Sequence, residues 1–204
     1  MALEADWGVE MMAFRRYALL GVSLFAVLFL TSGVAFGAKS YSDRVGDVKG
    51  GTGPDIASMT VSHTSTKVTF VVRFAKAPPL RVSESDGWVD MLLIGIDVPP
   101  LGLRPIPGGD WRGANFALGT HGPSQTGLMV RLGQGIPVES RQVARFKILT
   151  SGATLTFSIP RRALGNPAWF TFQVAAAREL AKEEQGGDAD FAPARGTFRY
   201  SLTS

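Results

Sequence analysis

The chain has 204 residues, 45% of them hydrophobic, and a formal net charge of +4 at pH 7. It contains no cysteine, which excludes thiol nucleophiles, cysteine-ligated zinc and iron–sulfur clusters, and its two histidines disfavour a histidine-rich metal site. The basic residues are scattered, and no basic stripe is interleaved with aromatic residues. We therefore expect no nucleic-acid partner.

The first predicted element is an export signal over residues 1–37. A positive pair, Arg15-Arg16, precedes an uncharged apolar run over 17–30. Small residues follow this run and favour cleavage before Ala38. We therefore expect a secreted or extracytoplasmic domain over residues 38–204.

Two alternatives concern this N-terminal segment. Acidic side chains within residues 1–10 are atypical of an export signal, and Met11 and Met12 directly precede the basic region. Residues 1–10 are therefore interpreted as lying upstream of the true start. The uncharged stretch 17–38 is also long enough for a membrane anchor, because spanning a bilayer takes about 20 apolar residues.

Short runs of alternating apolar and polar residues, punctuated by glycine and proline, fill the remainder of the chain. In the clearest run, Lys67–Phe74, every second side chain is apolar. The run Trp88–Asp97 is apolar on both faces, as expected for a central strand. Further strands are predicted over Ile56–His63, Ala114–Leu118, Gly127–Leu132, Val143–Leu149, Ala153–Ile159, Trp169–Ala175 and Thr197–Leu202.

This pattern predicts an all-β fold with hardly any helix. About eight to nine closely spaced strands are typical of an antiparallel β-sandwich, either jelly-roll or immunoglobulin-like. Residues 38–204 are then one domain. Val98–Arg112, rich in proline and glycine, and Asp188–Gly196 are predicted to be loops.

Aspartates gather in the predicted loops, and the first such loop carries Asp43, Asp47 and Asp55. Calcium takes about six to eight oxygen ligands, and flexible loops rich in Asp and Gly supply them readily. We therefore predict a calcium site at these three carboxylates. The alternative is that the aspartates only form turns, because their side chains bond nearby backbone N–H groups.

The aromatic candidate for ligand binding is Trp111, which lies between Asp110 and Arg112 in the long predicted loop. An indole face flanked by two hydrogen-bonding side chains suits stacking against a sugar. The alternative is that Trp111 folds back and covers one end of the core.

No catalytic arrangement is indicated. Asp90 and Asp97 lie seven residues apart on one predicted strand, and an odd separation places them on opposite faces of a regular strand. A pair of carboxylates facing one substrate is therefore not predicted. No Gly-x-Ser-x-Gly turn occurs either, so a serine triad lacks its nucleophile turn. We expect the protein not to be an enzyme.

Several segments, taken in order, resemble secreted bacterial DOMON-like β-sandwiches, which are relatives of the family 9 carbohydrate-binding modules. The segments are Asp43-Arg44-Val45-Gly46-Asp47-Val48 followed by Gly53-Pro54-Asp55-Ile56, Ile94-Gly95-Ile96-Asp97, Gly108-Gly109-Asp110-Trp111, Leu155–Arg161 with Leu164-Gly165, and Asp190-Phe191-Ala192-Pro193. The resemblance implies a non-catalytic sandwich that often binds sugars and sometimes calcium.

These observations lead to one expected function and one alternative. We expect an extracytoplasmic, non-catalytic module that binds carbohydrate or a similar polar ligand, such as a glycan or an envelope polymer, with calcium as the cofactor. The alternative is a structural or protein-interaction module of the cell envelope, with an envelope protein as its partner. A membrane is a partner only if the N-terminal segment is retained.

Overall fold

The computed structural model describes residues 36–99, 114–133, 140–180 and 188–203. The chain divides into two units, Met1–Ala35 and Phe36–Ser204, and the described residues belong to the second. The predicted export signal therefore lies almost wholly outside the described residues, as does most of the stretch interpreted as an anchor. Within the described ranges, no helix is long and apolar enough to cross a membrane.

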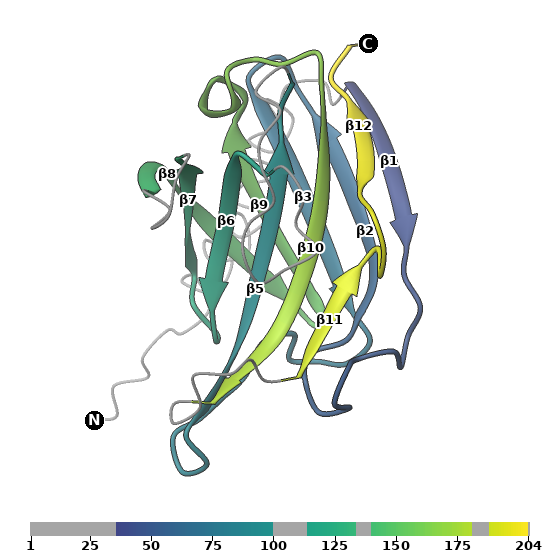
Figure 1. Cartoon of the computed structure of the whole chain (residues 1–204), viewed down its shortest axis with the longest axis vertical. Coiled ribbons are helices and arrows are strands. Elements are labelled where there is room, and N and C mark those ends of the chain that lie inside the picture. Colours follow the sequence, from purple (N-terminus) through teal and green to yellow (C-terminus); the bar gives the residue numbers. More distant parts are fainter. Residues whose placement is uncertain (1–35, 100–113, 134–139, 181–187, 204) are drawn as a thin grey trace, which may run out of the picture. The chain divides into compact units, whose positions relative to one another are not determined.

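The described residues form antiparallel strands and a single turn of 3-10 helix (Figure 1). The strands are β1 (Phe36–Ser42), β2 (Ile56–His63), β3 (Lys67–Phe74), β4 (Val82–Ser83), β5 (Trp88–Asp97), β6 (Phe116–His121), β7 (Thr126–Leu132), β8 (Ser140–Ser151), β9 (Thr154–Pro160), β10 (Trp169–Leu180), β11 (Ala189–Ala192) and β12 (Phe198–Ser201). The helical turn η1 (Arg161–Leu164) follows β9 and ends at Gly165.

The strands form one continuous sheet in the order β1-β2-β3-β9-β8-β7-β6-β5-β10-β11, with β12 also paired to β10 and β4 to β5. Strand β8 is shared along its length. Its residues 140–147 pair with β7, and its residues 148–151 pair with β9. The sheet curls at this shared strand, so that its two halves enclose one core.

The antiparallel all-β prediction is confirmed, but the described residues contain twelve strands rather than eight or nine. The additional strands are β1, β4 and β11. Strands β4 and β11 have two and four residues, which is too short for a period-two pattern to be recognised. The prediction of a loop over Asp188–Gly196 is wrong at Ala189–Ala192, because these residues pair with β10.

Period-two alternation builds the core. In β3 the buried side chains are the apolar ones at alternate positions, because successive side chains of a strand point to opposite faces. The ring of Phe70 on β3 lies 5.5 Å from the ring of Phe157 on β9 and 5.9 Å from that of Phe172 on β10. The two halves of the curled sheet therefore share an aromatic centre.

Hydrogen bonds join β1, the first strand of this unit, to β12, its last strand. The Tyr41 hydroxyl on β1 donates to the Arg199 carbonyl on β12 at 2.7 Å. The Tyr200 hydroxyl donates to the Gly37 carbonyl at 2.9 Å. Gly37 thus belongs to β1, although the sequence predicts it as the last residue of the cleaved signal.

Candidate functional site

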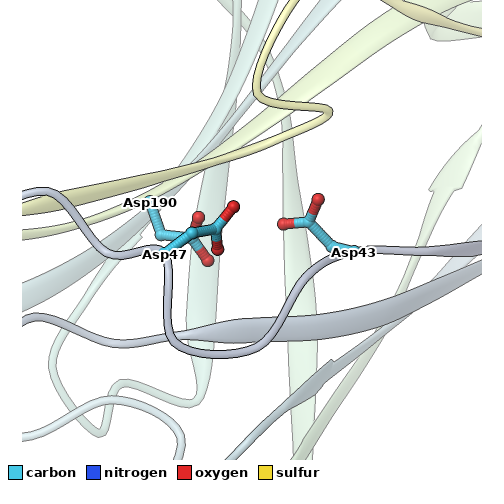
Figure 2. A group of neighbouring side chains, drawn as sticks. All are labelled: Asp43, Asp47 and Asp190. Carbon is cyan, nitrogen blue, oxygen red and sulfur yellow. The ribbon is translucent and has the colours of Figure 1, made fainter.

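Three aspartates from distant parts of the chain come together at one end of the sheet (Figure 2). Asp43 and Asp47 belong to the segment between β1 and β2, and Asp190 lies on β11. Each offers one carboxylate oxygen, and these oxygens lie within 4.8 Å of one another. Calcium–oxygen distances of about 2.3–2.6 Å allow two ligands of one ion to be at most about 5 Å apart. The spacing therefore fits a single hard cation.

Strand β11 fixes the position of Asp190. This residue lies opposite Ala176 of β10, is 1% exposed, and accepts a hydrogen bond from the Ile56 backbone N–H at 2.6 Å. An isolated β-bridge between Lys49 and Ala189 ties the loop before β2 to β11. Strand β11 is therefore paired with β10 on one side and with this loop on the other, which holds the loop aspartates against Asp190.

Asp55, the third residue of the predicted calcium set, is not one of the three clustered ligands. Its Oδ2 accepts a hydrogen bond from the Gly46 backbone N–H at 2.9 Å and so shapes the loop between Asp43 and Asp47. Its Oδ1 is buried without a hydrogen-bond partner, as is Oδ2 of Asp43. Buried acceptors normally have partners, so these two oxygens are suited to a cation.

The local electrostatics also favour a cation. Burial, followed by the nearby charge of Asp47, raises the pKa of Asp43 to about 6. Burial also raises the pKa of Asp190 to about 6, with further contributions from the charges of Asp43, Asp47 and Asp55. In the part of the chain that the structure describes, both ion pairs involve Asp90, so no Lys or Arg neutralises this cluster. A divalent cation would relieve the repulsion.

The donor set indicates which metal fits best. All the donors are carboxylate oxygens, which suit hard cations rather than zinc or copper. Carboxylates from a loop and a strand suit calcium, which takes oxygen ligands in flexible geometry, better than magnesium, which demands nearly ideal octahedral geometry. The residues present therefore fit calcium.

The sequence prediction did not include Asp190. The available signal was the segment Asp190-Phe191-Ala192-Pro193, which contributes to the family resemblance and lies in an acidic stretch. Its proximity to Asp43 depends on pairing between segments more than 140 residues apart, which local patterns do not reveal.

The predicted sugar-binding residues Trp111, Asp110 and Arg112 lie outside the described residues. Asp97, at the end of β5, accepts a hydrogen bond from the Asn115 side-chain amide at 3.2 Å. This contact fixes the start of β6 beside the end of β5.

No protein-family model, curated protein or solved structure matches this chain. Its function is therefore inferred from its own residues.

Proposed function

We propose that the chain is an extracytoplasmic, non-catalytic binding module that holds calcium at Asp43, Asp47 and Asp190 and binds carbohydrate or a similar polar ligand. The observation that carries the proposal is that these three carboxylates, which lie near the two ends of the domain's sequence, meet in space without a basic partner among the described residues. In this proposal calcium binds the N-terminal loop to β11 and makes that end of the domain rigid.

The proposal includes a two-layer β-sandwich. Two observations support this finer architecture: β8 divides its pairing between β7 and β9, and Phe70 packs edge-on against Phe172 of β10. Sandwiches of this kind carry loops at their ends, where ligands are bound without altering the core.

Thermal unfolding of the full-length chain with calcium and with a chelator tests the metal site. A ligand at a hundred times its dissociation constant adds about 2.7 kcal/mol. For a domain of this size, that corresponds to an increase of roughly 5–10 °C in Tm. We expect Asp190→Asn and Asp43→Asn to abolish the increase. Asp86→Asn, which changes an exposed aspartate near β4, serves as the control.

An absent calcium effect in the unaltered protein would contradict the metal site. The aspartates would then act as turn formers, and the envelope-module alternative would gain weight. Co-purification with an envelope protein, together with no saccharide binding, would support that alternative directly.

The carbohydrate part of the proposal is tested at Trp111. We expect Trp111→Ala to reduce retention on a polysaccharide column while Tm stays unchanged, because the sequence predicts that this indole serves in stacking against a sugar rather than in core packing. Equal retention of the variant and the unaltered protein across a broad glycan panel would contradict it.

A further inference from the structure

A cavity of about 300 Å³ lies beside the acidic cluster. Its lining includes Asp55, Lys76, Arg81 and Asp90, together with the glycine-containing loop at 51–53. Small-molecule pockets are typically about 300–1,000 Å³, so this cavity is at the lower end and suits a ligand the size of one sugar ring. Because Gly46 and Val48, which flank Asp47, also line the cavity, the cavity adjoins the proposed calcium site.

The charged groups of the cavity differ in whether they already have partners. Asp90 is fully buried and accepts hydrogen bonds from the Arg178 Nε at 2.8 Å and from the Arg81 backbone N–H at 3.0 Å. Asp55 Oδ1 has no hydrogen-bond partner. Lys76 is exposed and belongs to neither of the ion pairs found among the described residues. The exposed cation at the edge of the cavity is thus available to a ligand, whereas Asp55 Oδ1 is enclosed by protein atoms.

Arg81 supplies a second cation. Its Nε lies 3.5 Å from Asp90 Oδ2, and its side chain is 48% exposed. Because the ion pair is made through Nε, the terminal guanidinium nitrogens can contact a ligand while that ion pair persists. Pro78 and Pro79 add an apolar wall that suits the C–H face of a sugar ring.

We infer that this cavity binds a sugar acid, a monosaccharide unit that carries a carboxylate. The carboxylate pairs with Lys76 and Arg81, and the C–H face of the ring packs against Pro78 and Pro79. An amino acid presents the same carboxylate, but its ammonium group would lie beside the Lys76 and Arg81 cations and near a calcium ion. Hydroxyls avoid that repulsion, so a uronate is favoured. The inference rests on the proposed function, because it assumes that calcium is bound beside Asp55.

Calorimetric titration of the full-length chain in calcium tests this inference, with D-glucuronate as the probe. Glucose is the neutral counterpart, and alanine is the amino-acid counterpart. We expect glucuronate to bind about tenfold or more tightly than either. Glucose lacks the carboxylate that contacts Lys76 and Arg81, and the ammonium group of alanine opposes these contacts. Affinity for glucuronate should fall as salt is raised, since both cations are partly exposed.

Lys76→Ala should weaken glucuronate binding about tenfold and leave glucose binding unchanged. Lys67→Ala, which removes an exposed lysine at the start of β3, is the matched control and should leave glucuronate binding unchanged. Both side chains are exposed, so neither variant should alter folding, and equal Tm values verify this.

Calcium-induced stabilisation is measured on the same samples to separate the two proposals. A calcium shift without glucuronate binding, or with binding that Lys76→Ala does not weaken, overturns the sugar-acid inference alone. Tighter binding of alanine than of glucuronate also overturns it. Absence of the calcium shift overturns the proposed metal site and, with it, the inference that rests on it.

Discussion

Two buried aspartates have contrasting environments. Asp90 is fully buried, but it is paired with Arg178, whose guanidinium also stacks on the Trp88 ring at 3.7 Å from its centre. Asp190 is 1% exposed and faces other carboxylates. A buried charge is tolerated when it is paired and hydrogen-bonded, so Asp90 belongs to the structural framework. The uncompensated Asp190 is a binding candidate.

The raised pKa values of Asp43 and Asp190, both about 6, predict how acid affects the metal-free protein. Between about pH 4 and pH 6 these groups bind more protons in the folded state than in the unfolded state, where carboxyl pKa values are near 3.9. Their contribution to the free energy of unfolding therefore rises as the pH falls from 7 to 4. Calcium needs the ionised carboxylates, so the calcium-induced increase in Tm should shrink over the same range.

Unfolding scans at pH 7.5, 6 and 5, each with calcium and with a chelator, check this expectation. Burial and the charge of Arg161 lower the pKa of His63, so acid acts on His63 in the destabilising direction below about pH 6.5. Comparison with Asp190→Asn isolates the cluster from this background. A calcium shift at pH 5 as large as that at pH 7.5 would be inconsistent with binding by these carboxylates.

Asp90→Asn should lower the free energy of unfolding by about 3–5 kcal/mol, because it leaves the Arg178 charge, only 12% exposed, without its counter-ion. Urea titration measures the loss. Replacing both partners together, as in Asp90→Leu with Arg178→Met, should cost less than the single change. Asp86→Asn is the control. If Asp90→Asn and Asp86→Asn lowered the free energy of unfolding equally, this would argue against a buried pair.

At the scale of elements, β7 illustrates how a glycine permits close packing between strands. Gly127 lies opposite Phe146 of β8, and a Cβ placed on it would lie 2.3 Å from two atoms of that ring. The Phe146 ring therefore lies across the position that any other residue would occupy. Its stacking on Phe157 of β9, with ring centres 4.9 Å apart, connects the two parts of the curled sheet.

Gly127→Ala should consequently destabilise the fold by about 1–3 kcal/mol, the usual cost of overpacking. Gly119→Ala on β6 is the matched control, because its added Cβ would meet the Leu93 side chain at an ordinary 3.4 Å. The comparison is made between the denaturant midpoints of the two variants, provided that their m-values are equal. A Gly127→Ala variant as stable as the unaltered protein would mean that Phe146 moves aside freely.

At the scale of the whole molecule, stability depends on the aromatic centre that joins the two halves of the sheet. Phe70 is fully buried, and its ring contacts Phe157, Phe170 and Phe172. Because these rings come from β9 and β10, a change at Phe70 weakens packing on both sides of the core at once.

Phe70→Ala should cost about 3–5 kcal/mol, the typical loss for a large aromatic side chain that leaves a cavity. The neighbouring change Val71→Ala, at a half-buried position on the other face of β3, is the control and should cost far less. Guanidinium titration measures both. Equal losses would indicate that the two halves of the sheet do not share this core.

The sequence predicted more of the fold than of the candidate site. Strands β2, β3 and β5 begin and end where the sequence pattern places them, because alternation of side chains is a local property with a period of two. Strands β4 and β11 were not predicted, because they are too short to show alternation and are held by their partners. The same distinction explains why Asp43 and Asp47 were predicted as ligands together and Asp190 was not.

Composition and alternation alone determined that this chain is an antiparallel all-β protein without cysteine chemistry, and they indicated that its first loop is rich in carboxylates. The tertiary structure decided the strand order, the division of β8 between two partners and the meeting of Asp190 with the first loop. The physical reason is the separation in sequence between the residues that interact. Strand formation depends on side chains two positions apart, whereas the order of the strands and the composition of the acidic cluster depend on packing between residues far apart in the chain.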